Sequence, residues 1–358
     1  MARIELDLEH AYKSNPKQDS DYALLPLKMS FDDGGAYSLL GPSGCGKTTL
    51  LNIMSGLVTP SRGHVQFDGK DVTRATPQAR NIAQVFQFPV IYDTMTVAEN
   101  LAFPLRNRKM PQDQINQRVG KIAEMLDLSG QLNHRAAGLA ADAKQKISLG
   151  RGLVRPDVSA VLFDEPLTVI DPHLKWHLRR KLKQIHRELK LTLIYVTHDQ
   201  VEALTFAEQV VVMTRGSVVQ VGTAADLFER PSHTFVGHFI GSPGMNFLPA
   251  TVELDKIRIF GHDVQLPPDS RIAEGAIKLG IRPEYLKLVQ PNSAGALPMT
   301  ISMVQDVGTH MILTTRLNDV TVKTRLQTQF DKYAAGDTVW LQVLNEHTCI
   351  YRNEELAL

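Results

Sequence analysis

The sequence predicts an α/β protein with a mostly parallel sheet wrapped by helices, followed by a small all-β barrel. Strand-like apolar runs alternate with helical patterns up to about residue 225, and a glycine-rich loop joins one of these strands to a helix. After the segment 229–247, short strand-like runs separated by turn residues replace this alternation. We therefore expect one domain at 1–237, containing a helical subdomain at about 89–157, and a second domain at 238–358.

The totals exclude several classes of protein. A chain of 358 residues, 43% hydrophobic and 22% charged, is typical of a globular protein with more than one domain. Its net charge of +1 argues against a nucleic-acid partner. The longest apolar runs fall well short of the roughly 20 residues that span a bilayer, and the charged N-terminus does not resemble a signal peptide. Cys45 and Cys349 lack metal-site spacing, so we expect a reduced, cytoplasmic location.

The elements of the first domain follow from the periodicity of apolar residues. Strands are expected within 3–12, 36–41, 158–166 and 191–199, helices at 111–128 and 143–154, and a hairpin that turns at Arg215-Gly216. The helix at 111–128 places Val119, Ile122, Met125 and Leu126 on one face. The helix after residue 171 carries an apolar stripe made of Leu174, Leu178, Leu182, Ile185 and Leu189.

A phosphate-binding loop is predicted between the strand at 36–41 and the next helix. The run Gly41-Pro42-Ser43-Gly44-Cys45-Gly46-Lys47-Thr48 fits the pattern G-x-x-x-x-G-K-[ST], and Thr49 follows it. Glycines let backbone N–H groups turn inward around phosphate oxygens at a helix N-terminus. Lys47 supplies a charge for the β- and γ-phosphates, and Thr48 supplies a hydroxyl for Mg²⁺. The loop therefore predicts a P-loop NTPase that binds a nucleoside triphosphate.

Two further strands end in polar residues that suit this chemistry. Asp164 follows an apolar strand and would hold the Mg²⁺ shell, while Glu165 would polarise the attacking water as a general base. His198 ends the next strand and is interpreted as a sensor of the γ-phosphate, although a lone histidine is often structural. Gln87 could reach the metal or the water from a loop, but taken singly a glutamine indicates almost nothing.

With these residues in order, the chain resembles the nucleotide-binding subunits of ATP-binding cassette (ABC) transporters along essentially its whole length. Lys47 and Thr48 match Walker A, Gln87 the Q-loop, Asp164 and Glu165 Walker B, Asp171 the D-loop and His198 the switch histidine. The resemblance implies a RecA-like core with a helical subdomain. It also implies ATP and Mg²⁺ as cofactors and an adenine ring stacked on Tyr12. The segments "GSPGMNF" and "LGIRPEYL" resemble the OB-like TOBE domain of bacterial carbohydrate importers.

The sequence departs from this family at the signature motif. Where the family reads "LSGGQ", this chain has Leu139, Ala140, Ala141, Asp142 and Ala143. In the family this motif binds the γ-phosphate of the partner subunit's ATP, so Ala140 removes a hydroxyl donor and Asp142 opposes one anion with another. At about 5 Å and an effective dielectric of about 20, that repulsion is about 3 kcal/mol. Alternatively, Asp142 is simply the N-cap of the helix at 143–154; both interpretations can hold.

The resemblance implies a motor subunit of an importer, on the cytoplasmic face of the membrane, with two permease subunits and an extracytoplasmic solute-binding protein. The intact Walker residues beside a degenerate signature predict a second, non-identical ATPase subunit as partner, giving one competent and one degenerate site. The cargo expected is a carbohydrate or a polyol, with glycerol among the candidates. One alternative is a non-hydrolysing regulatory or binding ABC protein. A third interpretation is a member of the family that acts on DNA or ribosomes. It is less favoured because neither a second cassette nor a basic surface is evident in the sequence.

Overall fold

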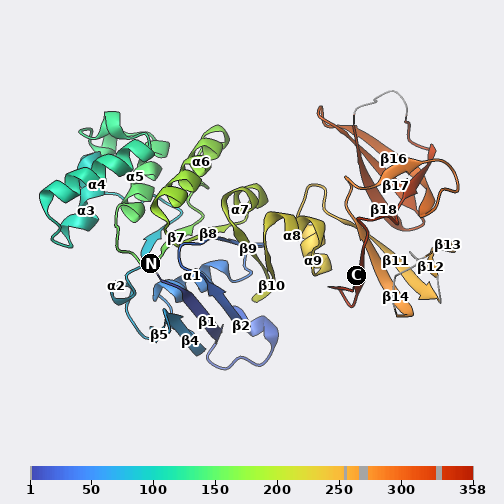
Figure 1. Cartoon of the computed structure of the whole chain (residues 1–358), viewed down its shortest axis with the longest axis horizontal. Helices are drawn as coiled ribbons and strands as arrows, with labels where there is room; N and C mark the ends of the chain where they lie inside the picture. Colours follow the sequence, from blue (N-terminus) through green and yellow to red (C-terminus); the bar gives the residue numbers. More distant parts are fainter. Residues whose placement is uncertain (1, 254–255, 266–272, 328–332, 358) are drawn as a thin grey trace. The chain divides into compact units, whose positions relative to one another are not determined.

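The computed structural model describes residues 2–253, 256–265, 273–327 and 333–357, and all elements below belong to these ranges (Figure 1). Contacts divide the chain into two compact units, Met1–Ala224 and Ala225–Leu358. This division comes earlier in the chain than the predicted boundary at 237/238. The reason lies in Arg282, a fully buried residue of the second unit that donates hydrogen bonds to the carbonyls of Leu227 and Ile240. The segment 225–240 is therefore bonded to the second unit.

The first unit is built on a mostly parallel sheet, as predicted. Its strand order is β10-β9-β3-β8-β7-β6, with parallel neighbours except for the antiparallel pair β9 and β10. The strands are β3 Ala36–Leu40, β6 Ala83–Val85, β7 Val161–Asp164, β8 Leu193–Thr197, β9 Gln209–Thr214 and β10 Ser217–Gly222. The predicted hairpin at Arg215-Gly216 is confirmed, and both residues have the positive φ, 47° and 78°, that a tight hairpin turn requires.

A second, antiparallel sheet of the first unit has the order β2-β1-β4-β5. Its strands are β1 Ile4–His10, β2 Leu24–Phe31, β4 Arg62–Phe67 and β5 Lys70–Asp71. The sequence pattern predicts β1 but not β2. The physical reason is that β2 contains Pro26 and its buried positions do not alternate regularly, so the period-2 signal of a strand is weak.

Three helices form the predicted helical subdomain: α3 Val97–Arg106, α4 Gln112–Met125 and α5 Ala141–Leu153 (Figure 1). Thr96 begins α3 through a capping box in which its side chain and that of Glu99 bond each other's backbone N–H. Ile115, Val119 and Ile122 bury one face of α4 in a core shared with α3, α5 and the parallel sheet. The amphipathic helix predicted at 111–128 is thus present, with its ends trimmed.

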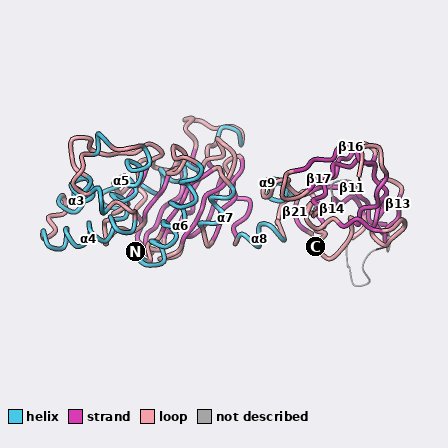
Figure 2. The backbone as a smooth tube through the Cα atoms, turned by 90° about the horizontal axis from the view of Figure 1, so that it is seen from above, coloured by secondary structure: helices cyan, strands magenta, loops and turns pink. Residues whose placement is uncertain are grey.

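The remaining helices are α1 Lys47–Ser55, α2 Pro77–Arg80, α6 Pro172–Leu189, α7 Gln200–Phe206, α8 Ala224–Glu229 and α9 Thr234–Phe239. Among them, α6 and α7 lie beside the strands of the first unit (Figure 2). In α6, Leu178, Leu182 and Ile185 are buried as predicted. The prediction for Leu174 was wrong, because it lies in the first turn of α6 and is 43% exposed.

The second unit contains the predicted all-β barrel, which follows the short helices α8 and α9. Two antiparallel sheets, β13-β12-β11-β14-β20-β21 and β15-β19-β16-β17-β18, enclose one apolar core. Their strands are β11 Asn246–Glu253, β12 Lys256–Ile259, β13 His262–Gln265, β14 Gly275–Ile281, β15 Lys287–Val289, β16 Ala296–Asp306, β17 Met311–Leu317, β18 Val320–Leu326, β19 Thr338–Gln342, β20 Cys349–Arg352 and β21 Glu355–Leu356.

Candidate nucleotide site

The predicted phosphate loop connects β3 to α1. Gly46 is the N-cap of α1 with a φ of 102°, and a Cβ atom there would lie 2.5 Å from the carbonyl oxygen of Ala23. Gly44 also has a positive φ, 79°, which L-residues with side chains rarely adopt. At Gly41 a Cβ would lie 2.2 Å from the carbonyl oxygen of Met213. The conformation of this loop therefore depends on glycine at these positions.

Lys47 opens α1 beneath this loop. Its side chain is buried, and its Nζ donates hydrogen bonds to the carbonyls of Gly41 and Pro42 at 2.8 and 2.9 Å. The loop thus holds the ammonium group at its own centre. Burial raises the pKa of the Cys45 thiol, so this side chain stays protonated and the residue contributes its backbone N–H to the loop. Ser43 lies on the exposed rim of the loop.

Asp164 ends β7 beside Thr48. The Thr48 Oγ1 atom donates to Asp164 Oδ1 at 3.4 Å, so a hydroxyl and a carboxylate from different elements lie together at the carboxyl edge of the sheet. Burial raises the pKa of Asp164, and the neighbouring Glu165 charge raises it further. Oxygen ligands of this kind suit Mg²⁺, which usually takes one or two carboxylates together with substrate phosphates.

Glu165 and His198 meet across the ends of β7 and β8. His198 Nδ1 lies 3.1 Å from Glu165 Oε1, and the imidazole is 55% exposed while the carboxylate is 24% exposed. The two strands are parallel neighbours, so their carboxyl ends reach the same edge of the sheet. The general base and the phosphate sensor predicted from the sequence therefore lie within contact distance of each other.

Tyr12 precedes the phosphate loop in the sequence, whereas Asp164 and Glu165 follow it. The Tyr12 hydroxyl lies 3.2 Å from Thr49 Oγ1 in α1. Its ring is 67% exposed and meets only the edge of His10 among the described aromatic contacts. An exposed aromatic face beside a phosphate loop is suited to stacking on a nucleobase.

Gln87 and Asp171 belong to different segments of the first unit. Gln87 is half-buried in the loop that follows β6. Asp171 is the N-cap of α6, where its carboxylate accepts a hydrogen bond from the His173 N–H at 2.9 Å. Their predicted roles toward the metal and the partner subunit remain predictions.

The degenerate signature forms the start of α5. The helix begins at Ala141, and its N-cap is Ala140, which has extended backbone angles and no side-chain capping bond. The prediction that Asp142 caps a helix at 143–154 was therefore wrong: the Ala140 carbonyl already accepts the bond from the Lys144 N–H at 3.0 Å. Asp142 occupies the first turn, where a carboxylate interacts favourably with the helix dipole. Ala143 is buried.

Nucleotide and metal fit this donor set. A glycine-rich loop, a buried ammonium group and a helix N-terminus suit the binding of phosphates, and the pair Thr48 and Asp164 provides oxygen ligands for Mg²⁺. Among the described residues there is no group of three or more His, Cys, Asp or Glu side chains that could hold a metal by itself. A magnesium ion here would need the nucleotide's own phosphates as further ligands.

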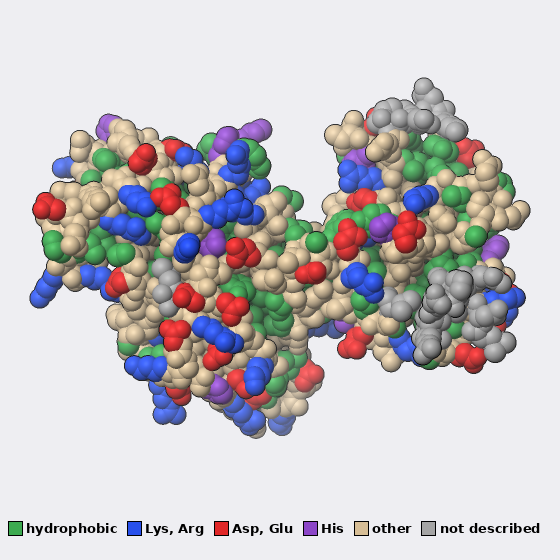
Figure 3. All heavy atoms as spheres, in the orientation of Figure 1, with side chains coloured by type: hydrophobic (Ala, Val, Ile, Leu, Met, Phe, Trp, Pro, Cys, Tyr) green, Lys and Arg blue, Asp and Glu red, His purple; other side chains and the backbone are tan. Residues whose placement is uncertain are grey.

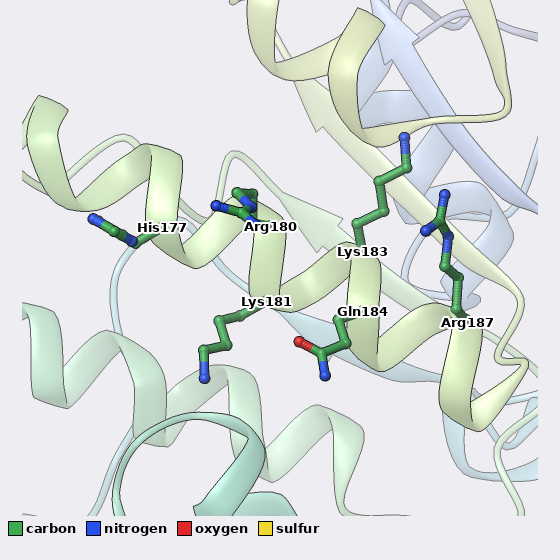
Figure 4. A pocket seen from close by; sticks show the side chains of 6 residues that line it. All are labelled: His177, Arg180, Lys181, Lys183, Gln184 and Arg187. Atoms are coloured by element: carbon green, nitrogen blue, oxygen red, sulfur yellow. The ribbon is translucent and has the colours of Figure 1, made fainter.

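A separate surface hollow of about 480 Å³ runs along α6, away from residues 41–49 (Figure 4). It is lined by His177, Arg180, Lys181, Lys183, Gln184 and Arg187. Lysine, arginine and histidine side chains gather over this helix on the face seen in Figure 3. In Figure 4 these side chains fan out around the helix rather than converge. The hollow therefore does not have the form of a ligand site.

Sequence reasoning missed two residues close to this site, Lys175 in α6 and Glu202 in α7. Glu202 is a carboxylate only 3% exposed, and it accepts hydrogen bonds from Tyr195 and Thr197 of β8. The available signal was an acid four residues after the strand-end His198. That spacing alone is indistinguishable from a solvated helix position.

Three known protein families match parts of this chain. A family described as "ABC transporter" matches residues 24–168, "MalK OB fold domain" matches 241–286 and "TOBE domain" matches 279–350. The chain is similar to the "sn-glycerol-3-phosphate import ATP-binding protein UgpC" of Escherichia coli K12, with 37% identity over 92% of this chain and 93% of that protein. The protein of that name from Salmonella typhi is 38% identical over 90% of both chains.

A solved structure of an ABC transporter component also matches this chain. That of cbiO1 from Clostridium perfringens, described as part of the ABC transporter complex cbiONQ, matches with a TM-score of 0.58 and 25% identity. The match covers 63% of this chain and 90% of that one. Within the described residues, none of the helices is long and apolar enough to cross a membrane.

Proposed function

Because this chain belongs to the ATP-binding subunits of ABC transporters, as an ATPase coupled to import, we propose that it works in an asymmetric pair with a different ATPase subunit. In this pair one site is competent and one is degenerate. The competent site combines this chain's phosphate loop, Glu165 and His198 with the intact signature of the partner. The degenerate site combines the partner's loop with residues 140–143 of this chain.

The observation that carries this proposal is the contrast between the two halves of the site. Lys47, Thr48, Asp164, Glu165 and His198 adopt an arrangement suited to ATP and Mg²⁺. By contrast, Ala140 offers no hydroxyl at the start of α5, and Asp142 places a carboxylate in its first turn. A helix N-terminus favours an anion, and here the chain supplies its own, which disfavours the approach of a phosphate from the partner.

Each residue of the competent half then has a distinct task. The loop N–H groups and Lys47 hold the phosphates, while Thr48 and Asp164 would hold Mg²⁺, which when bound would supply positive charge against the phosphate oxygens. Glu165 accepts a proton from the attacking water, and His198 orients the γ-phosphate and Glu165. Gln87 joins the metal or water when the site closes, and Tyr12 stacks on the adenine.

We base the proposed cargo and the other proposed subunits on the relatives named above. We propose a polyol, a carbohydrate or a phosphate ester of either as cargo, since the relatives named above import sn-glycerol-3-phosphate. Two permease subunits and an extracytoplasmic solute-binding protein complete the importer, with this chain at the cytoplasmic face of the membrane. We propose that a helix of a permease subunit docks in a hollow of about 220 Å³. This hollow is lined by Phe86, Val90, Pro104 and Arg151, among others. Val90 belongs to the segment 88–100, "FPVIYDTMTVAEN", which follows β6 and which we propose to contact the permease.

The asymmetric pair is tested by the turnover of ATP with and without a partner. The isolated chain should hydrolyse ATP slowly, and addition of the partner ATPase should raise the rate. The triple variant Ala140→Ser, Ala141→Gly, Asp142→Gly should raise the turnover of the isolated chain, because it restores a hydroxyl and removes the carboxylate. Fast turnover by the isolated wild-type chain, unaffected by any partner, would overturn the proposal.

Asp113→Gly is the matched control for this experiment. Asp113 occupies the same second position in the first turn of α4 that Asp142 occupies in α5. Asp113→Gly and the single change Asp142→Gly each remove a carboxylate from a helix N-terminus and add a glycine, so their costs in helix stability are similar. Only the change in α5 should alter turnover. An equal effect of both would show that the rate responds to helix stability rather than to the signature.

The alternative of a non-hydrolysing regulatory protein makes a different prediction. It requires that ATP bind without turnover in the complete transporter. The contact between Glu165 and His198 favours hydrolysis, since a protein that merely binds ATP does not need a general base at the edge of the sheet.

A further inference from the structure

A buried carboxylate, that of Glu202, lies four residues after the predicted sensor histidine. Glu202, in the first turn of α7, is 3% exposed. Its Oε2 accepts hydrogen bonds from the Tyr195 hydroxyl and from Thr197 Oγ1, each at 3.0 Å. Its Oε1 lies 3.5 Å from the Nζ of Lys175 in α6. Both carboxylate oxygens therefore have partners, and these partners come from β8 and α6.

Such an arrangement is not explained by stability alone. Removing a carboxylate and an ammonium group from water is unfavourable, and well-packed apolar residues often stabilise a protein as much as a buried ion pair does. A fully satisfied polar network does, however, fix the elements that it joins in one geometry.

The network encloses the backbone of His198. Thr197, the residue before it, donates to Glu202, and the Asp199 N–H after it donates to Thr197 Oγ1 at 3.0 Å. The Asp199 carboxylate in turn accepts from the N–H groups of Val201 and Glu202. The chain is thus held on both sides of His198, whose own side chain is 55% exposed and has little packing to orient it.

Lys175 extends the network toward Asp171. It lies one turn into α6, and its backbone N–H donates to the Asp171 carbonyl at 3.0 Å. Asp171 is the N-cap of that helix. A displacement of the start of α6 would therefore move the ammonium group that pairs with Glu202, and through Glu202 the turn that carries His198.

We propose that Lys175 and Glu202 form a positioning pair that holds His198 against Glu165 and couples it to the segment around Asp171. The proposal rests on the proposed function, because it requires that His198 act on ATP. Neither residue touches the nucleotide in this scheme; both act through His198. The pair therefore affects how fast bound ATP reacts and leaves the binding of ATP unchanged.

The first test compares Lys175→Met with Lys181→Met in the full chain, assembled with its transporter. Lys181 lies in the same helix and pairs with Asp127 at 2.8 Å, so its replacement removes one equivalent charge and one ion pair. We expect Lys175→Met to lower kcat about tenfold or more without changing the Kd of ATP, since a small misplacement of a reacting group has such an effect. Lys175→Arg should recover most of kcat. Equal rates for Lys175→Met and Lys181→Met would overturn the proposal.

The second test asks whether the effect passes through His198. In a His198→Ala background, Lys175→Met should cause no further loss of kcat. A further loss by the same factor as in the wild type would overturn the positioning role. A His198→Ala variant with wild-type turnover would refute the proposed function of His198 itself. Wild-type turnover of Lys175→Met beside an inactive His198→Ala would refute the positioning pair alone.

A second variant guards against unfolding as the cause of a slow rate. Thr197→Val keeps the shape of the side chain and removes the Oγ1 atom that joins Glu202 to Asp199. It should lower kcat in the same direction as Lys175→Met, with the Kd of ATP unchanged in both. If the thermal midpoint of either variant falls while its kcat stays at the wild-type value, the network is structural and the proposal is wrong.

Discussion

Glu165 Oε1 and His198 Nδ1 lie 3.1 Å apart, although they follow different strands. Glu165 adopts a φ of 47°, a left-handed conformation that costs a residue with a side chain about 1 kcal/mol or more. Its N–H donates to the Val196 carbonyl of β8 at 3.0 Å, which holds the turn in place. The sheet therefore directs the carboxylate of one strand end toward the imidazole of the next.

Glu165→Gln should abolish most hydrolysis in the assembled transporter while ATP still binds. The amide keeps the shape of the side chain but cannot accept a proton, and a general base contributes about a hundredfold or more to rate. Single-turnover hydrolysis and nucleotide binding measure the two effects. Glu188→Gln is the control, since Glu188 of α6 forms an exposed ion pair with Lys121 of α4. Equal rates for the two variants would contradict the role of Glu165.

The binding of Mg²⁺ should weaken as the pH falls, and it should do so at a higher pH than for an ordinary exposed aspartate. Burial, and then the Glu165 charge, raise the pKa of Asp164, so this carboxyl takes up a proton at a higher pH than an exposed aspartate, and the protonated form does not bind the ion. A Mg²⁺ titration of ATP binding at several pH values measures this effect.

Two variants separate the causes of this pH dependence. Asp164→Asn should bind Mg²⁺ weakly over the whole pH range, without the transition. Glu165→Gln removes the neighbouring negative charge and should shift the transition to lower pH. A transition that is unchanged in Asp164→Asn would assign the titration to another group.

Tyr12→Ala should raise the Kd of ATP about tenfold, because stacking of a base on an aromatic ring is worth about 1–3 kcal/mol. Tyr12→Phe keeps the ring, loses only the contact with Thr49, and should bind ATP nearly as the wild type does. The ring is 67% exposed, so neither change should affect folding. Equal ATP affinities for the alanine and phenylalanine variants would exclude stacking.

Arg282→Met should destabilise the second unit by about 3 kcal/mol or more, because it leaves buried carbonyls without donors. The guanidinium donates to the carbonyls of Leu227, Phe228, Gly237 and Ile240, and it lies 4.2 Å from the centre of the Phe228 ring. Calorimetry of the full chain measures the loss. Arg325→Met is the control, since Arg325 forms a partly exposed pair with Glu284 and should cost about 1 kcal/mol or less.

The core of the site could be predicted from the sequence because its signals are local. A glycine-rich loop between a strand and a helix specifies where Lys47 lies, and an apolar strand ending in two acids specifies Asp164 and Glu165. Parallel neighbours bring strand ends to one edge, so the approach of His198 also followed from the fold class.

Features that depend on tertiary contacts could not be predicted in this way. Glu202 is buried because Tyr195, Thr197 and Lys175 reach it from other elements, and a single acid in a sequence carries no sign of such partners. The start of α5 was misplaced because Ala140 caps it without a side-chain bond, whereas sequence reasoning expects a polar cap.

The attachment of residues 225–240 to the barrel bears on how this protein can be recombined with its relatives. A chimaera joined near residue 240 would separate Arg282 from the carbonyls of Leu227 and Phe228. The segment taken from the relative would then have to supply equivalent hydrogen-bond acceptors. A fusion point at Ala224 and Ala225 transfers donor and acceptors together. Chimaeras joined between Ala224 and Ala225 should fold more often than chimaeras joined at the start of β11, the first strand of the barrel.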